Sequence, residues 1–185
     1  MKRPRDSQRS RLHAAEWSVF GWPKMDFKSI ELLENYLWEV LENRHVQRRY
    51  PVAKEIVAGS IEITVANGGG LRKPMTIWDE QRVWVSFPRK YRTKWLVLHE
   101  IAHVLTPQDA AWHDREFAHI YLHLVKLFYG KEMQYKFKAA MKNSKYKYSK
   151  PHSRWNVPPT QEEKTIMLDR LLAGREKWLI TNGMS

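Results

Sequence analysis

The sequence predicts an α+β fold, with a small, mostly antiparallel sheet of about three strands packed with helices and a C-terminal helical appendage. Several stretches place apolar residues at helical spacing, and two short stretches alternate apolar and polar residues as half-buried strands do. With 185 residues, 43% of them hydrophobic and 12% aromatic, the chain is long enough for one buried core and a tail. We expect a domain over residues 1–142, followed by a basic linker and helix over 143–185.

In the first half, a helix is expected from near Ser7 to Phe20, where Gly21-Trp22-Pro23 ends it. Asp26 is a good N-cap, and the apolar positions that follow predict an amphipathic helix to about Asn43. The alternating stretches predict strands over residues 61–65 and 83–87, and a further strand is expected over 75–78.

The second half begins with a helix expected over 91–105, which should stop at Thr106 because Pro107 disfavours α geometry in the residue before it. A further helix is expected from His113 to Tyr129, where Gly130 ends it, and a shorter one follows. After Pro158-Pro159, a last helix is expected over 161–178.

The helix over 91–105 carries the pattern H-E-x-x-H. Residues i and i+4 lie on one helix face, so His99 and His103 can point both imidazoles at one metal ion. Glu100 follows at another angle, which suits a general base acting on water better than a third ligand. Because the surrounding residues are nearly all apolar, these polar groups need partners, and a metal ion supplies them. We therefore expect a zinc site with Glu100 as its catalytic residue.

A catalytic zinc usually has three protein ligands, so a third is required. We predict His113, which follows after nine intervening residues, enough for the chain to reverse. The competing candidates for the third ligand are Asp109, Asp114 and Glu116. Alternatively, His113 is an ordinary residue at a helix start, with Asp114 as the N-cap. A residue that stabilises the oxyanion of the substrate would also be needed. Four residues are candidates for this role: Tyr91, Arg92, His119 and Tyr121. His119 and His123 themselves are expected at the surface or behind the ligands.

Charge and composition limit the partners. Lys and Arg number 32 against 20 acidic residues, so a formal net charge of +12 favours polyanions. No cysteine is present, which excludes disulfides and thiolate metal sites and fits a reducing cytosol. Neither a secretory signal nor an apolar run long enough to span a bilayer is found. We expect a cytoplasmic protein with no membrane partner.

Residues 131–154 contain eight Lys or Arg and one acid, with aromatic residues between them. Basic side chains neutralise phosphates and aromatic rings stack on unpaired bases, so this segment is a candidate nucleic-acid contact, although a solvated face is the alternative. The candidate residues are Lys138, Lys142, Lys145, Lys147, Lys150 and Arg154.

Three blocks of the sequence resemble a known family. They are Arg5-Asp6-Ser7-Gln8-Arg9 leading to Ala14-Ala15-Glu16, then 97–103 with the histidine motif, and 113–117 running into 121–125. Together they resemble the small zincin-type metallohydrolases of actinobacteria and their phages and, more distantly, SprT-like metallopeptidases. The SprT-like second block supplies the third zinc ligand, which supports His113, although Asp114 stands here where that block has a small residue.

The resemblance implies a zinc-dependent hydrolase of peptide or protein substrates in a bacterial cell or a phage-infected host. It also implies that the strand before the motif helix forms a substrate-binding edge, a position that falls on Val83, Trp84, Val85, Ser86 and Phe87. The alternative hypothesis is a nucleic-acid-associated or virion accessory protein whose zinc site is structural or inactive.

Overall fold

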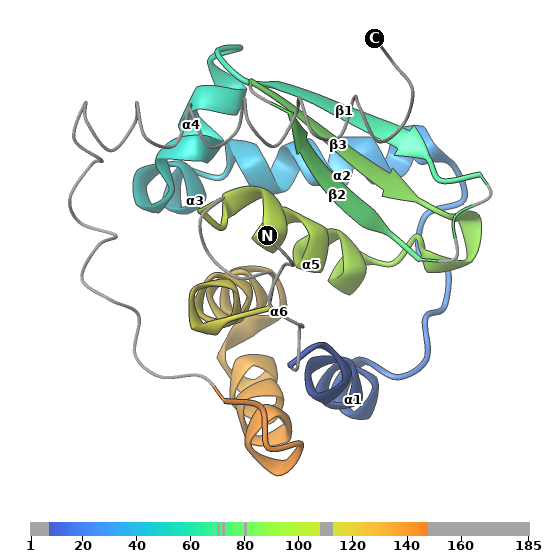
Figure 1. Ribbon diagram of the computed structural model, residues 1–185, viewed down its shortest axis with the longest axis vertical. Helices are drawn as coiled ribbons and strands as arrows, with labels where there is room; N and C mark the ends of the chain where they lie inside the picture. Colours follow the sequence, from blue (N-terminus) through green and yellow to red (C-terminus); the bar gives the residue numbers. More distant parts are fainter. Residues whose placement is uncertain (1–7, 70, 72, 80, 108–112, 148–185) are drawn as a thin grey trace, which may run out of the picture.

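The computed structural model describes residues 8–69, 71, 73–79, 81–107 and 113–147. Its elements are α1 (Arg9–Phe20), α2 (Ile30–Glu42), α3 (Arg44–Arg49), α4 (Pro51–Val57), β1 (Glu62–Asn67), β2 (Met75–Asp79), β3 (Arg82–Phe87), a 3₁₀ turn (Arg89–Tyr91), α5 (Lys94–Leu105) and α6 (Arg115–Asn143). The predicted α+β class is confirmed (Figure 1). The predicted helix over 161–178 lies outside the described residues.

The three strands form one mixed sheet in the order β1-β3-β2. β2 and β3 pair antiparallel, as expected, whereas β1 and β3 run parallel, so only one of the two pairings is antiparallel. The parallel pairing arises because β3 returns from the β2–β3 hairpin into the position beside β1. This arrangement makes β3 the central strand and leaves β2 at one edge.

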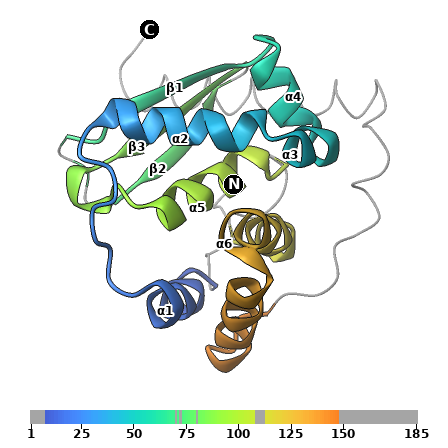
Figure 2. The same ribbon diagram turned by 180° about the vertical axis from the view of Figure 1, so that it is seen from behind.

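Helices α2 and α5 lie on the same side of the sheet (Figures 1 and 2). Alternation along β3 buries Val83, Val85 and Phe87, which join the core with Leu37 of α2 and Leu98 of α5. Helix α6 packs on α5 from the side away from the sheet, and α1 packs on α6. The central helix α5 therefore lies between the sheet and two further helices, which explains why nearly all its residues are buried.

The start of α2 differs from the predicted one. The N-cap of α2 is Ser29, whose Oγ accepts from the Leu32 amide at 3.2 Å, and not Asp26. Asp26 instead accepts from the Lys94 amide at 2.8 Å, and so holds the first turn of α5. The short helices α3 and α4, between residues 44 and 57, were not predicted, because neither is long enough to show a helical repeat.

The predicted break at Gly130 is confirmed as a kink. Its backbone (φ 88°, ψ 170°) is not helical, and the two halves of α6 meet there at a sharp bend (Figure 1). Across the bend, the Gln134 side chain donates to the Leu122 carbonyl at 3.1 Å. The folded unit extends beyond residue 142, because Tyr146 is buried and Lys147 donates its amide to the Gln8 side chain at 3.3 Å.

A candidate metal centre

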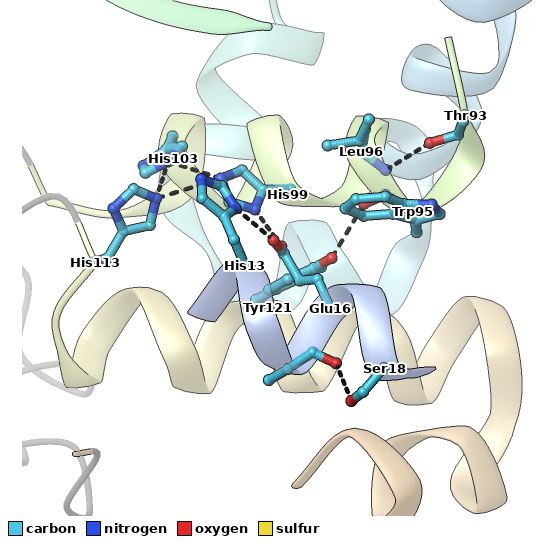
Figure 3. Close-up of polar contacts among 11 residues, drawn as sticks. His13, Glu16, Ser18, Thr93, Trp95, Leu96, His99, His103, His113 and Tyr121 are labelled. Atoms are coloured by element: carbon cyan, nitrogen blue, oxygen red, sulfur yellow. Dashed lines mark hydrogen bonds and ion pairs between the residues drawn. The ribbon is translucent and has the colours of Figure 1, made fainter. Parts of the chain in front are cut away.

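Three histidines converge at the C-terminal half of α5 (Figure 3). The Nε2 atoms of His99 and His103 are 3.2 Å apart, those of His103 and His113 are 3.2 Å apart, and those of His113 and His99 are 3.3 Å apart. Tetrahedral zinc with bonds of about 2.0–2.1 Å to each nitrogen requires nitrogen atoms about 3.4 Å apart. The three predicted ligands therefore lie together at a spacing that fits zinc.

The surroundings of the cluster hold the three rings in place. Phe117 of α6 lies beneath them, with ring centroids 4.3 Å from His103 and 5.0 Å from each of His99 and His113. The Asp114 side chain caps α6 by accepting from the Phe117 amide at 3.1 Å. The cap at Asp114 and the predicted ligand His113 are therefore neighbours, and the structure contains both. Behind them, the Tyr146 hydroxyl donates to the carbonyls of His113 and Asp114 at 2.8 and 3.0 Å.

Glu16 of α1 is a member of this site that the sequence did not reveal. Its side chain is fully buried, and its two oxygens lie 2.5 Å from His99 Nδ1 and 2.8 Å from His13 Nδ1 (Figure 3). A carboxylate that accepts from Nδ1–H leaves the Nε2 lone pair of His99 directed at the centre of the cluster. Although burial alone raises the pKa of Glu16, the imidazoles of His99 and His13 lower it to about 2.

His13 is the second unpredicted member. Its ring stacks on His99 with centroids 5.9 Å apart and meets His113 edge-on at 6.1 Å. Its Nε2 is buried and has no hydrogen-bond partner among the described residues. A sequence signal existed: α1 carries Glu16 as its one acidic residue, three positions after His13, where a helix places both on one face.

Glu100 is buried beside His99 and is held by the sheet. The Thr76 hydroxyl of β2 donates to Glu100 Oε2 at 2.6 Å. Burial raises the pKa of Glu100 above its usual range, although His99 and the bond from Thr76 oppose the rise. A higher pKa suits a group that takes up a proton and gives it back near neutral pH. In His103, burial and the neighbouring His99 and His113 lower the pKa, which favours the neutral imidazole that a metal requires.

The predicted substrate-binding edge is wrong in one respect. Val83 to Phe87 lie on β3, whose main chain pairs with β1 on one side and β2 on the other. A strand paired on both sides has no main-chain groups left for a peptide, because each ladder uses those groups. The edge strand that contacts α5 is β2, which also carries Thr76.

Of the other candidates, Tyr121 lies against the histidine cluster, whereas Glu116, Arg92, Tyr91 and His119 make other contacts. Glu116 pairs with Arg115 at 3.0 Å, and Arg92 donates to Asn67 at 2.9 Å. The rings of Tyr121 and His99 have centroids 5.5 Å apart, and the Tyr121 hydroxyl donates to the Trp95 carbonyl at 3.3 Å. Tyr91 packs against the Lys90 ammonium, and His119 lines a separate hollow on α6. Asp109 lies outside the described residues.

Four of the six predicted nucleic-acid contacts are brought together at the end of α6. Lys138, Lys142, Lys145 and Lys147 line a hollow of about 660 Å³. Lys150 and Arg154 lie outside the described residues.

Comparisons of this chain with family models, with curated proteins and with solved structures find no match. In the described part of the chain, no helix has the length and apolar character needed to cross a bilayer.

Proposed function

We propose that this chain is a zinc-dependent metallohydrolase that cleaves amide bonds in peptide or protein substrates. The observation that supports the proposal most strongly is the triangle of Nε2 atoms at zinc spacing, two of which come from the helix that also carries the buried carboxylate of Glu100. His99, His103 and His113 would hold the ion. A zinc ion bound there would lower the pKa of a water ligand towards ~7 and polarise a substrate carbonyl. The cytoplasmic location expected from the sequence is part of the same proposal.

The chain's own carboxylates divide the remaining work. Glu100 accepts a proton from the attacking water and passes it to the leaving amine, while the Thr76 hydroxyl holds it in one orientation. Glu16 holds the Nδ1–H of His99, so that its ring presents Nε2 to the metal. This division follows from contact: Glu16 touches the ligand ring from behind, whereas the Glu100 carboxylate accepts from Thr76 of the sheet.

For the substrate, the proposal uses the β2 edge in place of β3. An extended peptide can add to an exposed strand through main-chain hydrogen bonds. β2 is an edge of the sheet within the described residues, and its Thr76 reaches Glu100. A peptide along β2 would therefore lie close to the proposed general base.

The test is cleavage of unfolded protein and peptide mixtures by the zinc-loaded protein, followed by mass spectrometry. Activity should disappear on chelation and in Glu100→Gln, which should still bind zinc, and it should fall in Thr76→Val. Glu42→Gln, an exposed glutamate at the end of α2, serves as the control and should retain full activity. Absence of cleavage of any peptide by a zinc-loaded protein, or full activity in Glu100→Gln, would contradict the proposal.

One observation favours a second candidate, in which the zinc is structural and the protein serves as an accessory factor. The Nε2 of His13 has no hydrogen-bond partner in the part of the chain that the structure describes, and its ring lies close to His99 and His113. A rotation of its side chain could therefore add a fourth imidazole and close the site. In the structure His13 is outside the group of three whose ligand atoms lie within 4.8 Å of one another. Counting the imidazoles on bound zinc separates the two candidates.

A further inference from the structure

The kink of α6 creates a second hollow that the sequence does not predict. This hollow, of about 240 Å³, lies in the angle between the two halves of the helix, where α3 also approaches. Its lining comes from all three segments: Arg49, His119, Leu122, His123, Lys126, Gln134, Tyr135 and Lys138. The bend at Gly130 is what brings Lys126 and Lys138 to the same opening.

The two hollows adjoin each other. Tyr135 and Lys138 line both of them, so together they form one basic track from Arg49 through the kink to Lys147. Six basic side chains line this track: Arg49, Lys126, Lys138, Lys142, Lys145 and Lys147. Among the described residues no carboxylate lines either hollow, and Glu132, the acid nearest in sequence, pairs with Lys136 at 2.7 Å.

Two local features shape the track for a ligand. Tyr135, at the junction of the hollows, is 66% exposed although it is a large aromatic residue. At the far end, Lys145 adopts a left-handed conformation (φ 58°), after which Tyr146 turns inward and bonds to the carbonyl of His113. The loop is therefore fixed, with Lys145 and Lys147 exposed on either side of a buried tyrosine.

The cations around the second hollow also act on His123. Its pKa is lowered to about 4, first by burial and then by the charges of Arg49 and Lys126. The part of this shift that comes from the two cations has the sign expected where an anion is favoured.

We infer that the basic track from Arg49 to Lys147 binds single-stranded nucleic acid, with phosphates along the lysines and one base stacked on Tyr135. Stacking on an exposed ring requires an unpaired base, which a duplex does not offer. The track extends the predicted contact at Lys138–Lys147 to α3 and to the first half of α6, and it does not depend on the proposed hydrolase activity.

The test measures binding of the full chain to a fluorescent oligothymidylate by anisotropy over a range of salt concentrations. Lys138, Lys142 and Lys145 are changed to Gln together, and the control changes three exposed lysines elsewhere, Lys24, Lys28 and Lys54, to Gln. Both variants lose three charges, so a nonspecific effect of net charge would be equal. The track variant should bind more than tenfold more weakly at moderate salt, and its slope of log affinity against log salt should fall by about 2.

The aromatic contact is tested separately. Tyr135→Ala should weaken binding roughly 5- to 100-fold, whereas Tyr135→Phe, which keeps the ring, should bind as the wild type does. Tyr135 is exposed, so neither change should alter the melting temperature. The inference is overturned if the track and control variants lose affinity equally, if Tyr135→Ala has no effect, or if a duplex of equal length binds as tightly as the single strand. It is also overturned if the protein binds anionic phosphatidylserine vesicles but not the strand.

Discussion

Two helices of this protein each carry a pair of histidines four residues apart, and the two pairs have different surroundings. His99 and His103 on α5 meet a third imidazole, and Glu16 lies 2.5 Å from His99 Nδ1. His119 and His123 on α6 face Arg49, Lys126 and Lys138 in a basic hollow. Moreover, Nδ1 of His123 is engaged by the Tyr50 hydroxyl at 3.0 Å.

The difference shows that spacing places two rings on one face of a helix but does not make a metal site. A carboxylate behind one ring fixes its tautomer and stabilises positive charge near it, whereas neighbouring cations oppose the arrival of a metal ion. The first pair therefore has the electrostatic surroundings of a cation site and the second those of an anion site.

The largest expected effect is the contrast between His103→Ala and His123→Ala, each of which removes the second histidine of its pair. Loss of a partner that orients a ligand typically lowers metal affinity by roughly 10- to 100-fold. His103→Ala removes a ligand itself, so zinc affinity should fall by more than this. His123→Ala should leave zinc affinity unchanged. Competition with a chromophoric chelator measures both, and equal losses would show that the two pairs do not differ as described.

A smaller effect is expected for Glu16→Gln, which removes the charge behind His99 and keeps the side-chain volume. Zinc affinity should fall by roughly 10- to 100-fold, because an orienting partner of a ligand is weakened. Glu100→Gln is the matched control, since it also replaces a buried carboxylate next to His99 but should retain zinc. An unchanged affinity in Glu16→Gln would remove the proposed role of this residue.

Tyr146→Phe should cost about 1 kcal/mol of unfolding free energy, because the hydroxyl that bonds to the carbonyls of His113 and Asp114 is lost. Chemical denaturation of the variant and of Tyr135→Phe, whose hydroxyl is on an exposed ring, measures the difference. Equal stabilities of the two variants would show that the loop after α6 does not support the third ligand.

The smallest effect concerns His123 and pH. Its folded-state pKa is about 4, below the unfolded value of about 6.5, so between these pH values the unfolded state binds a proton that the folded state does not. Stability should therefore fall as pH is lowered from about 6.5 to 4. His123→Gln, which can still accept from Tyr50, should show a shallower fall, and parallel curves of stability against pH would contradict this.

The sequence predicted most of the elements near the site, for physical reasons that can be named. The apolar surroundings of the H-E-x-x-H motif identified α5, and alternation identified β1 and β3. The turn back to His113 could be expected from loop length alone. These are local patterns, and local patterns are visible in one sequence.

What could not be predicted depends on contacts between distant segments. Glu16 and His99 are 83 residues apart, and no spacing rule joins them. The position of β3 in the middle of the sheet follows from the parallel pairing with β1, which no pattern within either strand encodes. Likewise, the second hollow requires α3 and both halves of α6 to meet, and α3 itself was not predicted.

The most direct test of the central claim is zinc K-edge X-ray absorption on the purified protein carrying one zinc per chain. An open zinc centre should show three imidazole ligands and one oxygen ligand, with no imidazole from His13, and His113→Ala should lose one imidazole. Failure to retain stoichiometric zinc, or a sphere of four imidazoles that becomes three in His13→Ala, would contradict a zinc centre open for catalysis.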